Sequence, residues 1–234
     1  MSRSVVIHQP DFLPWLGYFH RLLEADLFIA LDHVQFVTGT SRSWTHRDMI
    51  KTPQGPKWLS LRVQKTPFGT PIRDIQLAPG ADWRQDNLNM IRENYRKSPY
   101  FDEVFPRLEA LYANPTRNMA EMNLASLDLL EDMLDVKTPR MISSQMAPQG
   151  TSTAMLVDLL KKAGATRYIS GQGARAYLDE KLFQDAGIEL VWQAFRHPVY
   201  PQSHGEFAPM LSSVDALFNC GQDGARALLR EQAT

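Results

Sequence analysis

The first thirty residues constrain the fold more than any other part of the chain. Val5–Ile7 is a β-branched run typical of a buried strand, and Leu27–Leu31 is a second apolar run of strand length. Apolar residues at helical spacing predict a helix over Trp15–Ala25, and Pro14 suits its first position. Strand, helix and strand follow one another within about 28 residues, enough for a parallel crossover. We therefore expect a β-α-β unit here.

Beyond this unit the pattern predicts a helical middle and a return to alternating strands and helices. The stretch His33–Lys57 is irregular, and strands are expected at Lys57–Val63 and Ile72–Leu77. The expected helices of the middle are Trp83–Lys97, Phe101–Tyr112 and Asn118–Leu134. In the last third we expect a helix from Thr151 to Ala163, a strand at Thr166–Ser170, a helix at Ala174–Ala186 and a strand at Glu189–Phe195.

These elements predict one α/β domain over residues 1–234, with a parallel-sheet core built from the N- and C-terminal α/β segments and a helical insert at about 83–135. The pattern alone leaves open whether the two α/β segments share one sheet or form two subdomains. Either arrangement would place the carboxyl ends of the parallel strands, where ligands bind in open α/β sheets, close to several polar loops.

Composition excludes several classes of protein. A net charge of −1 provides no global field for nucleic acid or for an anionic membrane, so we expect no nucleic-acid partner and no membrane insertion. Cys220 is the single cysteine, which excludes an internal disulfide, and the six histidines include no metal-binding pair at helical spacing. With no apolar run long enough for a signal peptide, a cytoplasmic location is expected.

The densest cluster of candidate site residues lies in the loop between the first strand and the first helix. His8 is a candidate catalytic residue, and Gln9, Phe12, Trp15 and Gly17 are candidate substrate-binding residues. Two prolines stiffen this loop at the end of the strand, and a glycine at the first helical turn permits close approach of a ligand. The alternative is a stiff structural turn in which His8 is satisfied by its neighbours.

A second cluster follows the second strand. Asp32 ends that strand, Gln35 comes next, and Trp44 and Arg47 form an aromatic–guanidinium pair. Such a pair can stack against a ring and bind a phosphate or carboxylate. We expect Arg47 to act in catalysis and the other three residues to bind substrate, although a surface loop packed around one tryptophan would carry the same residues.

Two further loops follow the later strands. Ser170–Ala176 is a degenerate match to the dinucleotide-binding turn, and the next strand ends without an acidic partner for a ribose. Contact of Gly171 and Gly173 with a phosphate or substrate is the more specific expectation. His197, Tyr200 and Gln202 form a polar aromatic loop in which His197 is a candidate base, although the loop would equally serve to anchor the C-terminal helix.

Together these motifs resemble the WbqC-like protein family in order and spacing. The resemblance rests on motifs spread along nearly the whole chain: His8-Gln9-Pro10-x-Phe12-x-Pro14-Trp15-x-Gly17, Asp32-x-Val34-Gln35-Phe36, Trp44-x-x-Arg47, Tyr95-x-Lys97-x-Pro99, Tyr168-Ile169-Ser170-Gly171-x-Gly173 and His197-Pro198-x-Tyr200-x-Gln202. The family often has Asn-Arg-Asn where this chain has His46-Arg47-Asp48. Members are associated with bacterial O-antigen and other surface-polysaccharide gene clusters. The resemblance therefore implies a small-molecule substrate, namely a nucleotide-linked amino sugar, and transfer or ligation of an acyl or aminoacyl group.

Three mechanisms remain open at this stage. In the first, a transferase takes an already activated acyl group, with His8 or His197 as general base. In the second, the N-terminal unit resembles nucleotidylyltransferases and pantothenate synthetase, and His20 helps to bind ATP while an acyl-adenylate forms; the histidine-x-glycine-histidine spacing of those enzymes is absent. In the third, the protein binds a sugar nucleotide without catalysis. The sequence gives neither the cofactor nor the oligomeric state.

Overall fold

The N-terminal β-α-β unit forms as expected. In the computed structural model, which describes residues 2–38, 43–79 and 82–231, β1 (Ser4–His8) and β2 (Leu27–Ala30) pair in parallel from Val5↔Leu27 to His8↔Ala30. The connecting helix α1 (Leu16–Leu23) begins directly after Trp15. Both strands are buried almost throughout, as a central parallel pair must be.

Both ends of the chain contribute to one five-stranded parallel sheet. The other strands are β5 (Arg140–Ile142), β6 (Arg167–Ser170) and β7 (Glu189–Trp192), and the strand order is β5-β2-β1-β6-β7. This is the order of a doubly wound, Rossmann-type sheet. The chain runs outward from β1 to β5 and then crosses back to β6, so the order reverses between β1 and β6. An α/β fold with a parallel core is therefore confirmed, and the two α/β segments share a single sheet.

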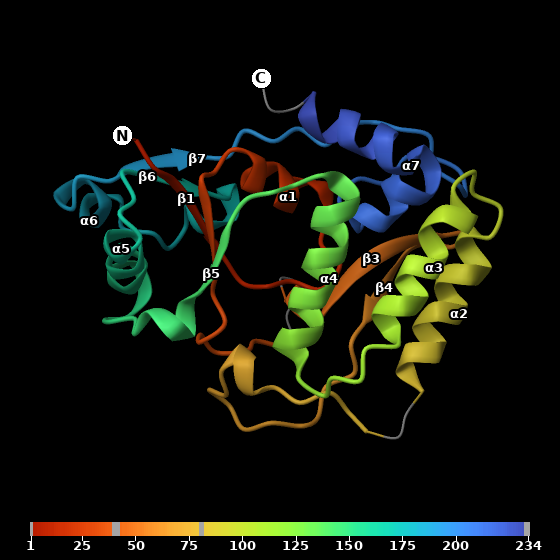
Figure 1. The fold of residues 1–234 in the computed structure, drawn as a ribbon, viewed down its shortest axis with the longest axis horizontal. Coiled ribbons are helices and arrows are strands. Elements are labelled where there is room, and N and C mark those ends of the chain that lie inside the picture. Colours follow the sequence, from red (N-terminus) through yellow and green to blue (C-terminus); the bar gives the residue numbers. More distant parts are fainter. Residues whose placement is uncertain (1, 39–42, 80–81, 232–234) are drawn as a thin grey trace.

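Helices cover the sheet on both faces (Figure 1). Val5 and Ile7 of β1 pack against residues of α5 (Ser152–Lys162) and against Phe183 of α6 (Glu180–Asp185). Val6, on the opposite side of the same strand, belongs to a larger core with α1 and α7 (Ser213–Arg230). The alternation along β1 therefore serves two cores, one on each face.

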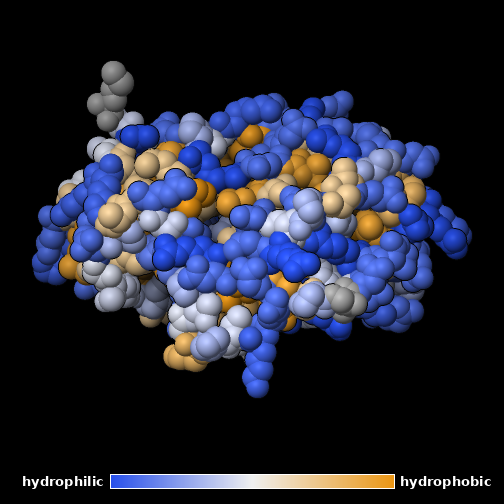
Figure 2. Space-filling model, turned by 60° about the horizontal axis from the view of Figure 1, so that its bottom comes forward, coloured by the Kyte–Doolittle hydropathy of each residue, from blue (hydrophilic) through white to orange (hydrophobic). Residues whose placement is uncertain are grey.

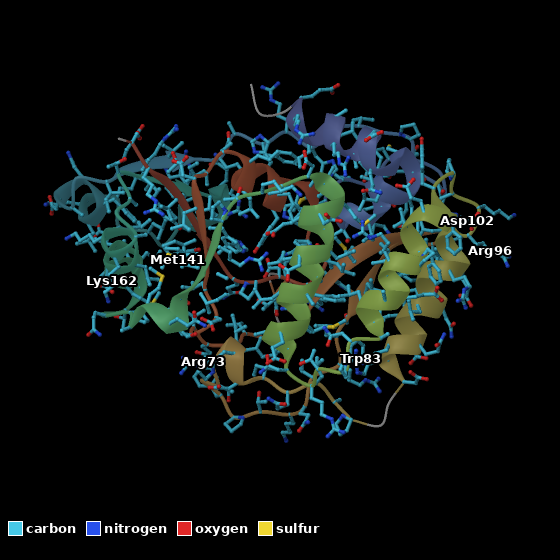
Figure 3. All side chains as sticks on the ribbon, in the orientation of Figure 1. Arg73, Trp83, Arg96, Asp102, Met141 and Lys162 are labelled. Carbon is cyan, nitrogen blue, oxygen red and sulfur yellow. The ribbon has the colours of Figure 1, made fainter. Side chains whose placement is uncertain are left out.

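The insert consists of three helices and contacts a separate hairpin. The helices are α2 (Trp83–Tyr95), α3 (Phe101–Tyr112) and α4 (Met119–Leu134), and the antiparallel hairpin consists of β3 (Arg47–Thr52) and β4 (Gly55–Ser60). Figure 3 shows Arg96, at the end of α2, and Asp102, in the first turn of α3, at the opposite end of the molecule from Lys162 of α5. The insert helices share the larger core with α1 and α7.

Some expected elements differ from the structure. The stretch expected to be irregular contains β3, whose polar residues Asp48, Lys51 and Thr52 are buried. Lys51 finds its partners in a distant segment and Thr52 finds its partners in the hairpin turn, so the sequence shows no apolar alternation there. The strand expected at Ile72–Leu77 is wrong: Ile72–Asp74 is a 3-10 turn that buries Ile72 and Ile75 three residues apart.

Two boundaries in the last third also differ. The helix expected at Ala174–Ala186 is wrong in its first half, which is a 3-10 turn (Gln172–Ala174) and loop, because Asp179 caps a new helix by accepting a hydrogen bond from the Lys181 N–H. The strand β7 ends at Trp192, three residues before the expected end, and the chain then leaves the sheet.

The surface carries no large apolar band on the face in Figure 2, where hydrophilic residues predominate and hydrophobic ones are scattered. None of the helices formed by the described residues has the length and apolar character needed to cross a bilayer.

Candidate functional site

The loop after β1 is held in place by residues far away in sequence. The Asn123 side chain donates hydrogen bonds to the carbonyls of Pro10 (2.7 Å) and Thr45 (2.6 Å). The Ser212 hydroxyl donates to the Leu13 carbonyl at 2.6 Å, where Leu13 has a positive φ of 45°. Because buried backbone groups need such partners, the loop keeps one conformation at the carboxyl end of β1.

A cleft opens at this loop, at the point where the strand order reverses, and it has two lobes. The larger, of about 430 Å³, is here named the Arg21 lobe and is lined by residues that include Trp15, Arg21, Asp48, Gly171, Gly173 and Gln193. The smaller, of about 390 Å³, is named the apolar lobe and includes Leu31, Val34, Ser152 and Met155 in its lining. Residues common to both linings are Ile7, His8, Asp11, Trp44, Leu156, Tyr168, Tyr177 and Leu178.

Arg21 is the most unusual group in the cleft. It is 6% exposed, and within the described part of the chain its guanidinium has no hydrogen bond and no carboxylate within 4 Å. Its one close interaction is with the ring of Tyr18, whose centroid lies 5.9 Å from Cζ. Burial lowers the pKa of Arg21, yet a guanidinium stays charged at any physiological pH. A buried cation without a counter-ion, facing a cavity, is an anion-binding group.

The turn after β6 is shaped around this guanidinium. A Cβ atom at Gly171 would lie 3.0 Å from Arg21 Nη1, closer than nearly all real Cβ contacts, whereas one at Gly173 would meet no atom within 4 Å. Gly171 therefore lets the cation lie directly against the carboxyl end of β6. Ligands in doubly wound folds bind at this edge of the sheet.

His8 and Asp11 lie side by side at the junction of the two lobes. His8 Nδ1 lies 3.0 Å from the Gln9 carbonyl and 3.5 Å from Asp11 Oδ2. A carbonyl only accepts, so Nδ1 carries the hydrogen and Nε2 carries a lone pair. Among described residues Nε2 has no hydrogen-bond partner, and the His8 side chain is 32% exposed. His8 is thus oriented as a proton acceptor.

Burial sets the charge states of these groups. It lowers the pKa of His8 to about 3, with help from the nearby Arg21 charge. Burial raises the pKa of Asp11 to about 7, although Arg21 and Thr45 oppose this shift. The pKa of Asp48, on the wall of the Arg21 lobe, is raised well above its usual range by the same cause. At neutral pH Asp11 is therefore only partly ionised, and it compensates the positive charge of Arg21 only in part.

The structure brings six of the sequence-predicted site residues to the cleft lining: His8, Gln9, Trp15, Trp44, Gly171 and Gly173. Four others lie behind the lining. Phe12 is fully buried in the core, and a Cβ at Gly17 would lie 2.3 Å from the Trp15 ring. Arg47 stacks on Trp58, which contacts Trp44, and His197 stacks on Trp15 with ring centroids 6.2 Å apart. These four hold the two cleft tryptophans or their loop rather than line the cavity.

The remaining predicted residues are placed elsewhere. His20 is buried and contacts Gln193 at 3.1 Å, so Gln193 separates it from the cleft. Asp32 accepts hydrogen bonds from Ser143 and Ser144, and Gln35 pairs with Pro71.

Tyr200 and Gln202 belong to a network at the base of the hairpin. Gln202 accepts a hydrogen bond from the buried Lys51 at 3.1 Å, and both Lys51 and Tyr200 lie near Asp215. This network ties the segment before α7 to β3.

Sequence reasoning did not single out Arg21, Asp11, Tyr168, Tyr177 or Gln193 as site residues. The signal for Arg21 was present: it shares a helix face with Gly17 and His20, and that face turns toward the carboxyl ends of the strands. Gly17 and His20 of this face were predicted to bind substrate, and in the structure Gly17, His20 and Arg21 are all buried.

No group of three His, Cys, Asp or Glu side chains in the described ranges is arranged to hold a metal ion. The site is a cleft with one buried cation and a histidine–carboxylate pair, at the reversal point of a doubly wound sheet. This fold and site define a doubly wound α/β protein whose cleft contains a buried arginine.

Comparison with known proteins places the chain more narrowly: it belongs to the WbqC-like protein family, whose profile matches residues 9–227. A relative from Mycobacterium tuberculosis (strain ATCC 25618 / H37Rv), described as uncharacterized protein Rv1507c, is 33% identical over 224 residues, or 94% of this chain and 95% of that protein. No solved structure matches the chain significantly.

Proposed function

We propose that this protein is a transferase that moves an acyl or aminoacyl group onto the amine of a nucleotide-linked amino sugar. The observation that carries the proposal is the buried Arg21, which lacks a partner and lies against Gly171 at the strand-order reversal. A diphosphate supplies the charge that Arg21 lacks and can accept two of its hydrogen bonds. Membership of a family associated with surface-polysaccharide gene clusters supports a sugar nucleotide as the source of that diphosphate.

The chemistry needs one proton acceptor, and His8 suits this role. The sugar amine attacks the carbonyl carbon of an activated acyl donor, such as a thioester, and a C–N bond forms while the bond to the leaving thiol breaks. The proton released from nitrogen passes to His8 Nε2 and then to the departing sulfur. Asp11, 3.5 Å from Nδ1, stabilises the imidazolium in the interval. His197 stacks behind Trp15, so His8 is the better base of the two.

The adenylate-forming alternative receives less support from the geometry. It assigned His20 to the nucleotide phosphates, and His20 lies behind Gln193. An ATP-dependent ligase at this site would rely on Arg21 alone. A protein that only binds a sugar nucleotide would use Arg21, but it would not need the lone pair of His8 Nε2 in the cleft.

The test measures binding and turnover separately. Calorimetric titration with UDP- and dTDP-linked amino sugars should show binding, and Arg21→Gln should weaken it at least tenfold, because each hydrogen bond to a charged group contributes about 1.5–3 kcal/mol. The matched control is Arg96→Gln, an exposed arginine at the far end of the molecule (Figure 3).

Turnover is followed by mass spectrometry of the amide product with acyl thioesters as donors. His8→Gln should abolish the product while sugar-nucleotide binding persists. Binding that is unaffected by Arg21→Gln would show that the site is wrong. Binding without product from any thioester, in the wild type, would favour the non-catalytic alternative, and product that appears only with ATP and a free acid would favour the ligase.

A further inference from the structure

We infer that the apolar lobe receives an aliphatic acyl chain longer than acetyl. This inference rests on the proposed function and specifies its donor. The two lobes differ in the residues that each adds to their shared lining. Arg21 lies on one side of His8, and Leu31, Val34 and Met155, with Gln9, Ser152 and Thr153, lie on the other. An anionic sugar nucleotide and an acyl donor with an aliphatic chain would match these two lobes.

The aliphatic wall is built from two sides of the sheet edge. Leu31 and Val34 follow β2, and Met155 and Leu156 come from α5. Leu178 completes the wall from the segment after β6. All five side chains are partly or largely buried, yet they face a cavity of about 390 Å³. A hollow lined by such residues gains free energy when an apolar chain fills it.

Two of the polar residues in this lining have partners within the protein. Thr153 Oγ1 accepts a hydrogen bond from the Asp179 N–H at 3.1 Å, and the Gln9 side chain accepts one from Thr45 at 2.6 Å. Behind the lining, His33 Nε2 lies 3.0 Å from the sulfur of Met155. These contacts hold the wall in place around its aliphatic side chains.

The position of His8 links the two halves of the substrate pair. His8, Asp11 and Trp44 line both lobes, so a carbonyl at their junction would have its chain in the apolar lobe and the sugar amine approaching from the Arg21 lobe. The amine would then attack beside His8 Nε2. No rearrangement of the cleft is needed for the two substrates to meet.

The experiment uses neutral mimics of the amide product, so that Arg21 plays no part. Dissociation constants of acetamide, butanamide and hexanamide are measured by NMR titration, with the tryptophan indole resonances as reporters, because Trp44 lines both lobes. Each added methylene should tighten binding about fourfold until the lobe is full.

Val34→Phe is the decisive variant, because Val34 lines only the apolar lobe. It should remove the dependence on chain length, whereas the matched control Val37→Phe, at a side chain 47% exposed, should keep it. Inorganic pyrophosphate, titrated into the same samples, reports on the Arg21 lobe. If the wild-type protein binds pyrophosphate but binds all three amides equally well, this inference is wrong and the proposed function stands. If the wild-type protein does not bind pyrophosphate, the proposed function is wrong.

Discussion

Arg21 illustrates how one residue can serve function at the expense of stability. Arg21 is 6% exposed, and no carboxylate of the described residues lies within 4 Å of its guanidinium. Folding therefore removes a charge from water without the compensation that a salt bridge provides. Burial also lowers the pKa of Arg21, because it destabilises the charged form. Under the proposed function, an anionic ligand supplies the missing negative charge.

Arg21→Met should therefore stabilise the ligand-free protein. The substitution keeps a long side chain and removes the buried charge, so the free energy of unfolding should rise by about 1–3 kcal/mol while pyrophosphate binding is lost. Urea denaturation with and without pyrophosphate measures both effects. A destabilised Arg21→Met protein would mean that the guanidinium has a structural partner.

Asp11 should make stability depend on pH. Its native pKa of about 7 exceeds the unfolded value of 3.8, so the native state binds the proton more tightly. The stabilising contribution is complete below pH 3.8 and is lost as the pH rises through 7, a change of roughly 4 kcal/mol at most. Asp11→Asn cannot titrate, so its stability relative to the wild type should increase between pH 4 and 7.5. Parallel pH profiles from urea denaturation would contradict the assignment.

At this scale the sequence predicted the residues that a motif makes conspicuous. His8, Trp15 and Trp44 were recognisable because rigid loops carry them, and they do line the cleft. Arg21 was not singled out, because its burial is a property of the packed helix and not of its neighbours in sequence. Arg47 and His197, predicted as catalytic, lie behind the cleft tryptophans. The spacing of a motif does not distinguish residues that line a cleft from residues that hold the lining in place.

Among the elements, the turn between β6 and α6 positions the guanidinium most directly. Gly171→Ala would place a methyl group 3.0 Å from Arg21 Nη1 and push the cation off the strand end. We expect at least a fivefold weaker binding of pyrophosphate, measured by calorimetry. Gly173→Ala, two residues on, meets no atom within 4 Å and should have the smaller effect. Equal effects would show that the turn binds the anion through its own backbone.

The elements that the sequence predicted well are those with a local cause. The strands of the first crossover and the insert helices have clear periodicity, and they are found within a few residues of their expected positions. The hairpin strand β3 was not predicted because Lys51 is satisfied by Gln202 and by backbone carbonyls of the segment before α7. Those partners lie about 150 residues away, and no pattern within the strand predicts them.

The whole molecule is connected through the loop after β1. The loop accepts hydrogen bonds from Asn123 of α4 and from Ser212 and Ser213 at the start of α7, and its Leu13 N–H donates to Ser126 of α4. The larger core also joins the insert to the sheet. We therefore propose that residues 1–234 unfold as a single unit, with the insert as part of the domain that supports the cleft.

Asn123→Ala should test this connection. It leaves the Pro10 carbonyl without its buried side-chain donor, a loss of about 1–3 kcal/mol, and leaves the Thr45 carbonyl with only the Phe12 N–H. Unfolding should remain a single transition at lower urea, and pyrophosphate should bind more weakly because the loop lines the Arg21 lobe. Asn89→Ala, at an exposed position of α2, should change neither. Two separate transitions would contradict the single unit.

The strand order has a consequence for the time course of synthesis. Strand β1 pairs on one side with β2, which leaves the ribosome soon after it. Its other edge pairs with β6, where Ser4 lies opposite Arg167, and β6 is synthesised much later. About 160 residues separate them, which at 5–20 residues per second amounts to roughly 8–30 s. During that interval β1, which is buried in the finished fold, has an unpaired edge. Nascent chains of this protein should therefore depend on chaperones more than their final stability would suggest.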